Sequence, residues 1–122
     1  MSAKTILYVE DNELNRKIVR DLLRRTSYRL LEAVDGEAGI AMALAERPDL
    51  ILMDIQLPMI DGYEAARRIK ANPALHHIPI IAVTSYALSG DDVKAFAAGC
   101  DDYVAKPFSP RALLAKVREY VP

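Results

Sequence analysis

The sequence has a single cysteine, almost no net charge and no long hydrophobic run. Because Cys100 is the only cysteine, no disulfide can form within the chain, and a reducing compartment, the cytoplasm, is expected. No apolar stretch approaches the roughly 20 residues that a membrane-spanning helix needs. The start, Met1–Lys4, leads directly into a strand-like segment without the apolar core of a signal peptide. Secreted and membrane proteins are therefore not expected.

The charge balance also argues against nucleic-acid binding. Sixteen Lys and Arg face seventeen Asp and Glu, which gives a formal net charge of −1. The 122 residues, of which 52% are hydrophobic and 27% charged, are typical of one globular domain. No linker or low-complexity segment interrupts them. We expect a single domain over residues 1–122 with no second domain, although a domain excised from a larger protein would look the same.

Five short apolar runs predict β-strands. They are Thr5–Val9, Arg29–Ala33, Leu50–Met53, Ile80–Val83 and Tyr103–Ala105. The third and fourth do not alternate polar with apolar residues, which is typical of strands buried on both faces of a parallel sheet.

The intervening segments have helical length and period. Their apolar sets are Leu14, Ile18, Val19, Leu22 and Leu23 in residues Glu13–Arg25; Ile40, Ala41, Leu44 and Ala45; Ala65, Ala66 and Ile69; Val93, Phe96 and Ala97; and Leu113, Leu114, Val117 and Val121. Helix starts are indicated at Asp35-Gly36, Asp61-Gly62 and Ser109-Pro110, and helix ends before Pro48, Pro73 and Gly99. The repeated βα pattern predicts a doubly wound parallel α/β sheet with five helices on its two faces.

Acidic residues follow strands whose carboxyl ends should meet at one edge of the sheet, where such folds bind ligands. Glu10 and Asp11 follow the first predicted strand and Asp54 the third, with Thr84 and Lys106 after the fourth and fifth. Three carboxylates would raise one another's pKa values, and one lysine cannot balance them. Clustered carboxylate oxygens suit Mg²⁺.

These residue types fit phosphoryl transfer. That reaction depends mostly on positioning and on neutralising charge on the phosphoryl oxygens. A carboxylate such as Asp54 can attack phosphorus and form an acyl phosphate. Lys106, the Thr84 hydroxyl and Mg²⁺ would each take one phosphoryl oxygen.

The motifs together resemble the receiver domain of bacterial two-component response regulators. The resemblance covers essentially the whole chain, in order and spacing, and is carried by Glu10-Asp11-Asn12, Leu52–Gly62, Val83-Thr84-Ser85 and Lys106-Pro107-Phe108. It implies a flavodoxin-like (CheY-like) sheet of strand order 2-1-3-4-5.

The resemblance also implies roles at the metal and phosphorylation site. Asp54 would be the phosphorylated residue and, with Asp11 and the backbone carbonyl of Gln56, would bind Mg²⁺, for which Mn²⁺ can substitute. Glu10 would act on the ion mainly through a water molecule. Lys106 would pair with a phosphoryl oxygen, and the Lys106-Pro107 peptide bond would be cis.

A conformational switch is implied as well. The Thr84 hydroxyl would move to the phosphoryl group and Tyr103 would turn into the vacated space, changing the face formed by the fourth helix, fifth strand and fifth helix. Gln56 and Tyr86 would flank the attacking water, so we predict self-dephosphorylation over minutes or longer, although Gln56 could instead position that water.

The implied partners are proteins. A sensor histidine kinase or histidine phosphotransferase would donate the phosphoryl group, and a downstream protein would bind the switched face. The chain would be a monomer or a weak, phosphorylation-dependent dimer. The basic residues of the first helix suit either a docking surface or a solvated face; they are Arg16, Lys17, Arg20, Arg24 and Arg25.

Other functions fit less well. A phosphohydrolase with an aspartyl nucleophile would need a second Asp where Gln56 stands, and a flavin carrier would need a phosphate-binding loop where Glu10–Glu13 is acidic. His76-His77 suits a solvated turn rather than a metal site. Cys100 suits a small buried residue, because no base adjoins it.

Overall fold

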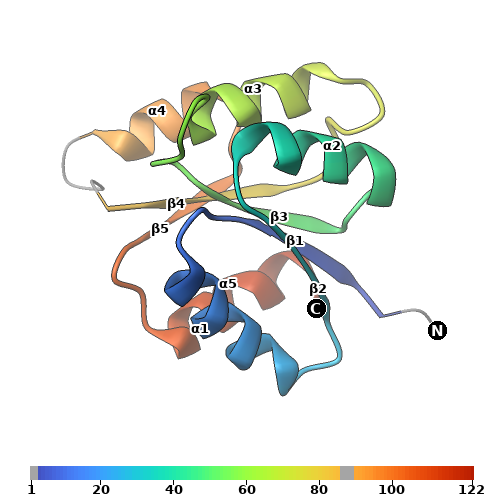
Figure 1. Cartoon of the computed structure of the whole chain (residues 1–122), viewed down its shortest axis with the longest axis vertical. Helices are drawn as coiled ribbons and strands as arrows, with labels where there is room; N and C mark the ends of the chain where they lie inside the picture. Colours follow the sequence, from blue (N-terminus) through green and yellow to red (C-terminus); the bar gives the residue numbers. More distant parts are fainter. Residues whose placement is uncertain (1–2, 86–89) are drawn as a thin grey trace.

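In the computed structural model, which describes residues 3–85 and 90–122, five parallel strands form one sheet in the order β2-β1-β3-β4-β5 (Figure 1). The strands are β1 (Thr5–Val9), β2 (Arg29–Ala33), β3 (Leu50–Asp54), β4 (Ile80–Thr84) and β5 (Asp102–Ala105). The helices are α1 (Glu13–Arg24), α2 (Gly36–Glu46), α3 (Gly62–Ala71), α4 (Asp91–Ala97) and α5 (Pro110–Tyr120). The predicted flavodoxin-like topology is confirmed.

Helices cover both faces of the sheet. Helices α1 and α5 lie against one face, and α2, α3 and α4 against the other (Figure 1). Along β1, Ile6 and Tyr8 pack with the first group of helices, whereas Leu7 and Val9 pack with the second. Every residue of β1, β3 and β4 is buried, which explains why these strands lack polar alternation.

Side-chain caps define where most helices begin. The side chains of Asn12, Asp35, Asp61 and Ser109 each accept a hydrogen bond from the backbone N–H three residues later. The starts predicted at Asp35, Asp61 and Ser109 are confirmed. None of the helices in the described ranges is long and apolar enough to cross a membrane.

Several predicted boundaries were wrong by one residue. Strands β3 and β4 each extend one residue further than expected, so Asp54 and Thr84 are the last strand residues rather than the first loop residues. Strand β5 begins at Asp102, and α1 ends at Arg24 rather than Arg25. Backbone pairing extends the strands, because Asp54 still lies opposite Val83 and Thr84 opposite Ala105.

The predicted apolar faces of three helices were partly or wholly wrong. Helix α1 buries Val19 and Leu23 but exposes Leu14 and Ile18. For α4 the prediction was wrong throughout, because Val93, Phe96 and Ala97 are all exposed. Helix α2 faces the sheet through Gly36, Gly39 and Ala43, and leaves Ala41, Leu44 and Ala45 exposed. The reason lies in the close approach of α2, since a Cβ on Gly39 would come within 2.7 Å of the Val9 side chain. Small residues must face the sheet there, so the larger ones face outward.

Candidate functional site

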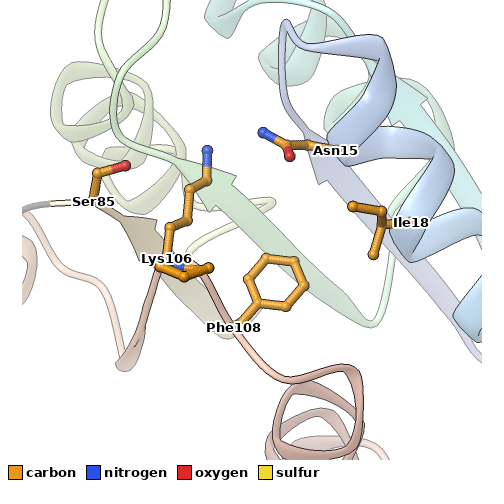
Figure 2. Close-up of a pocket in the computed structure, with 6 residues that line it drawn as sticks. Asn15, Ile18, Ser85, Lys106 and Phe108 are labelled. Carbon is orange, nitrogen blue, oxygen red and sulfur yellow. The ribbon is translucent and has the colours of Figure 1, made fainter.

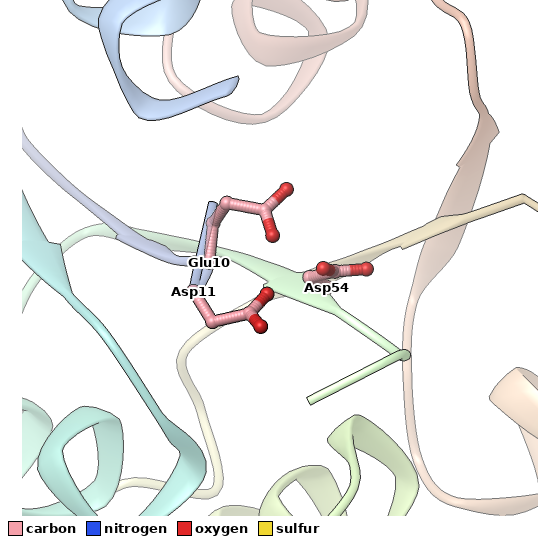
Figure 3. Close-up of side chains that lie close together, drawn as sticks. All are labelled: Glu10, Asp11 and Asp54. Atoms are coloured by element: carbon pink, nitrogen blue, oxygen red, sulfur yellow. The ribbon is translucent and has the colours of Figure 1, made fainter. Parts of the chain in front are cut away.

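Three carboxylates meet at the carboxyl ends of β1 and β3. Glu10 and Asp11 directly follow β1, Asp54 ends β3, and the two strands are neighbours in the sheet. One oxygen from each carboxylate lies within 4.8 Å of the others (Figure 3). Glu10 and Asp54 are each only 1% exposed, whereas Asp11 is open to solvent. The predicted acidic cluster is therefore assembled by the fold.

Lys106 reaches into this cluster from the end of β5. Its Nζ lies 2.8 Å from Glu10 Oε1 and 3.1 Å from Asp54 Oδ2. Figure 2 shows the extended side chain between Ser85 and Asn15. Burial alone would lower the pKa of Lys106, but the carboxylates of Glu10 and Asp54 outweigh it and raise that pKa. The ammonium group therefore remains charged.

One ammonium group leaves the carboxylates under-neutralised. Burial and the neighbouring Glu10 raise the pKa of Asp54 to about 7. Burial also acts to raise the pKa of Glu10, but hydrogen bonds with Asp54 and Lys106 lower it to about 2. Asp11 is open to solvent, but desolvation by the neighbouring groups and the nearby Glu10 still raise its pKa. This set of oxygen donors, short of positive charge, fits a hard divalent cation such as Mg²⁺.

Two residues that sequence reasoning missed hold Glu10. The Tyr8 hydroxyl donates to Glu10 Oε1 at 3.2 Å and the Asn15 side-chain amide donates to the same oxygen at 3.0 Å. Strand alternation could have indicated Tyr8, because residues two apart point to the same face. Asn15 was harder to find from the sequence. Its position three residues after Asn12 indicates only that its backbone N–H is capped by the Asn12 side chain.

The residues assigned to the switch lie on neighbouring strands. Thr84 is fully buried at the end of β4. Tyr103 of β5 lies opposite Ala82 of β4. Because Ala82 and Thr84 point to the same face of the sheet, Tyr103 and Thr84 share that face. The Tyr103 ring packs edge-on against Phe96 of α4, with centroids 6.0 Å apart.

The residues assigned to phosphoryl lifetime are only partly described. Gln56 receives a 3.4 Å hydrogen bond from the Ser85 backbone N–H on its side-chain oxygen, and its own backbone N–H lies 3.3 Å from Asp54 Oδ1. Tyr86 lies outside the described residues. The backbone of Gln56 is thus beside the acidic cluster, and its side chain extends toward the end of β4.

A pocket of about 350 Å³ adjoins the site between α1 and the segment after β5. The Lys106-Pro107 peptide bond on its wall is cis. Figure 2 shows the lining, which consists of Asn15, Ile18, Ser85, Lys106, Pro107 and Phe108. The pocket places apolar surface next to the acidic cluster.

Most of the basic side chains on α1 are paired with acidic groups. Arg16 and Arg20 both contact Glu13 and Glu32, and Lys17 contacts Asp21 at 2.7 Å. This pairing reduces the net positive charge that α1 could present to a partner. His76 and His77 are exposed, and Cys100 is buried.

Comparison with known proteins establishes the family. The response regulator receiver domain family matches residues 6–118, so the chain belongs to the receiver domains of two-component response regulators. In particular, it is similar to the polar-differentiation response regulator DivK of Brucella anthropi, at 41% identity over 97% of this chain and 96% of that protein. The runs Val9–Asn15 and Asp49–Pro58 in the sequence also favour a DivK-like regulator.

Solved structures agree with this assignment. The receiver domain of the sensor histidine kinase PA1611 from Pseudomonas aeruginosa, with a magnesium ion coordinated in its active-site cleft, is 39% identical. The structural match covers 98% of this chain and 98% of that chain, with a TM-score of 0.91. The chemotaxis response regulator CheY4 of Vibrio cholerae is 25% identical, with a TM-score of 0.91 over 97% of this chain and 98% of that one.

Proposed function

We propose that this receiver domain is a phosphorylated switch in which Asp54 accepts a phosphoryl group in a Mg²⁺-dependent reaction. The observation that carries the proposal is the cluster of three carboxylates, two of which, Glu10 and Asp54, contact the Lys106 ammonium group, with Nζ 3.1 Å from Asp54 Oδ2. The magnesium ion in the PA1611 receiver domain supports the same metal here. Asp11, Asp54 and the Gln56 carbonyl would hold the ion directly, Glu10 would act on it mainly through a water molecule, and Mn²⁺ is expected to substitute for it.

The chemistry follows from charge and position. An oxygen of the ionised Asp54 carboxylate attacks the phosphorus of a phosphohistidine, the P–N bond breaks, and the imidazole leaves with the bonding electrons. Lys106 would neutralise one phosphoryl oxygen, and the Thr84 hydroxyl would donate to another. Bound Mg²⁺ would supply further positive charge for the carboxylates and the phosphoryl group.

Phosphorylation would then change the surface of the domain. A new dianionic group beside Thr84 favours the arrangement that brings the Thr84 hydroxyl toward it. Tyr103 would turn inward and give up its edge-on contact with Phe96 on α4. The exposed Val93 and Phe96 belong to the α4–β5–α5 face, which we propose as the surface that binds a downstream protein.

The phosphoryl donor is expected to be a sensor histidine kinase or a histidine phosphotransferase. The pocket between α1 and the segment after β5 opens beside Lys106, so a donor histidine could approach Asp54 from there. A single receiver domain without an output domain, a cytoplasmic location, and a monomer or weak phosphorylation-dependent dimer remain predictions.

The test is the intact mass of the protein after incubation with acetyl phosphate and Mg²⁺. We expect a labile gain of one phosphoryl group, absent in Asp54→Asn and absent after chelation of Mg²⁺. Decay of the adduct over minutes or longer would agree with the lifetime predicted from Gln56 and Tyr86. A folded wild type that binds Mg²⁺ but gains no phosphoryl group would contradict the proposed function.

A further inference from the structure

Three hydrogen-bond donors hold one carboxylate oxygen of the Glu10 side chain. Oε1 accepts from Lys106 Nζ at 2.8 Å, from the Asn15 amide at 3.0 Å and from the Tyr8 hydroxyl at 3.2 Å. A carboxylate oxygen offers about two lone-pair directions, so these three donors occupy Oε1 fully. The other oxygen, Oε2, accepts one longer hydrogen bond, from the Asn12 N–H at 3.4 Å, so a cation at the acidic cluster would meet this oxygen.

Tyr8 makes this contact from inside the protein. Its side chain is fully buried among the residues that pack with α1 and α5, and its hydroxyl donates a hydrogen bond to Glu10. An aliphatic residue would fill this strand position without a hydroxyl. The hydroxyl has a specific orientation because buried polar groups must find partners.

We propose that Tyr8 is a positioning residue for the metal site. Its hydroxyl, together with Asn15, holds Glu10 Oε1 away from the cation so that only Oε2 faces it. The proposal rests on the proposed function, since it assumes that the acidic cluster binds Mg²⁺. Side chains that orient metal ligands in this way commonly change metal affinity about 10–100-fold when they are removed.

The matched variants are Tyr8→Phe and Tyr28→Phe. Each loses one tyrosine hydroxyl that donates a hydrogen bond, but the Tyr28 hydroxyl donates to the Val121 carbonyl on α5's C-terminal side, not to the metal site. Mg²⁺ binding is measured by calorimetry on the whole protein. We expect Tyr8→Phe to weaken Mg²⁺ binding about tenfold, and Tyr28→Phe to bind as the wild type does.

Two further measurements separate positioning from a general loosening of the fold. The chain has no tryptophan and six tyrosines, so its near-ultraviolet spectrum reports mainly on tyrosine. We expect Mg²⁺ to produce a tyrosine difference spectrum that Tyr8→Phe loses and Tyr28→Phe keeps. The phosphorylation rate of Tyr8→Phe should return to the wild-type value at saturating Mg²⁺.

The outcomes are distinct. Equal Mg²⁺ affinity in Tyr8→Phe and wild type, or equal weakening in both tyrosine variants, would overturn the role of Tyr8 and leave the proposed function intact. A wild type that does not bind Mg²⁺ would overturn the proposed function itself. If Tyr8→Phe did not fold, Asn15→Ala at the half-exposed start of α1 would take its place, and unchanged Mg²⁺ affinity there would overturn the proposal.

Discussion

At the scale of single residues, the chemistry of the site depends on Asp54 being both buried and short of positive charge. The same burial that excludes water raises its pKa to about 7, so the proton leaves near neutral pH rather than near 4. The single positive charge of Lys106 does not offset the two buried carboxylates, although its ammonium group contacts both. A metal ion and a proton therefore compete for the same carboxylate.

This competition predicts the pH dependence of Mg²⁺ binding. Because only the ionised form of Asp54 binds the cation well, affinity should rise with pH, and be about tenfold weaker at pH 6 than at pH 8. Calorimetric titration at both pH values measures this difference. Asp54→Asn is the control, for which we expect weaker Mg²⁺ binding and a flatter pH dependence of the Mg²⁺ affinity. A wild type with equal affinity at the two pH values would contradict the raised pKa.

At the scale of elements, the helices fix the backbone that carries the acidic residues. The first residue of α3, Gly62, lies so close to the end of β3 that a Cβ there would come 2.3 Å from the Asp54 carbonyl oxygen and 2.8 Å from Ile55 Cα. The Gly62 N–H also donates to the Ile55 carbonyl at 3.0 Å. The start of α3 thus sets the position of Asp54.

We therefore expect Gly62→Ala to destabilise the fold by about 3 kcal/mol and to slow phosphorylation, because the backbone around Asp54 must move. Urea unfolding and the rate of phosphorylation by acetyl phosphate measure the two effects. Gly36→Ala is the matched control, since Gly36 also begins a helix after an Asp cap. Its Cβ would meet mainly the movable side chain of Ile60, so a smaller loss is expected. Equal losses in both variants would contradict the role of Gly62.

At the scale of the whole molecule, the acidic cluster weakens the metal-free fold. The pKa of Asp54 is raised from its usual 3.8 to about 7, so its contribution to stability is present below about pH 4 and is lost as the pH rises through 7. A cation that neutralises the cluster should reverse this loss at neutral pH.

We predict that Mg²⁺ at 100 times its pH 8 Kd stabilises the protein by about 2.7 kcal/mol at pH 8, and that the same Mg²⁺ concentration stabilises it less at pH 6. Thermal unfolding with and without Mg²⁺ at the two pH values checks this. Sodium chloride at matched ionic strength is the control. Stabilisation by sodium chloride as large as that by Mg²⁺ would indicate general screening instead of a specific site.

Local sequence patterns determined the elements and the chemical character of the site. Unbroken apolar runs predicted the buried strands, Asp and Ser caps predicted helix starts, and polar residues after the strands predicted one acidic edge. These signals are local, because a residue's neighbours in sequence already decide whether it can pair in a strand, cap a helix or end an element.

The tertiary structure alone decided which helix faces are buried and what holds Glu10. Gly39 at the contact with β1 turned the larger residues of α2 outward, against the apolar periodicity. Tyr8, Asn15 and Lys106 come from β1, α1 and the end of β5, and they meet on one carboxylate oxygen only when the chain is folded. Tyr8 and Asn15 are close to Glu10 in the sequence, but Lys106 is 96 residues away, and no local pattern encodes the distance between such segments.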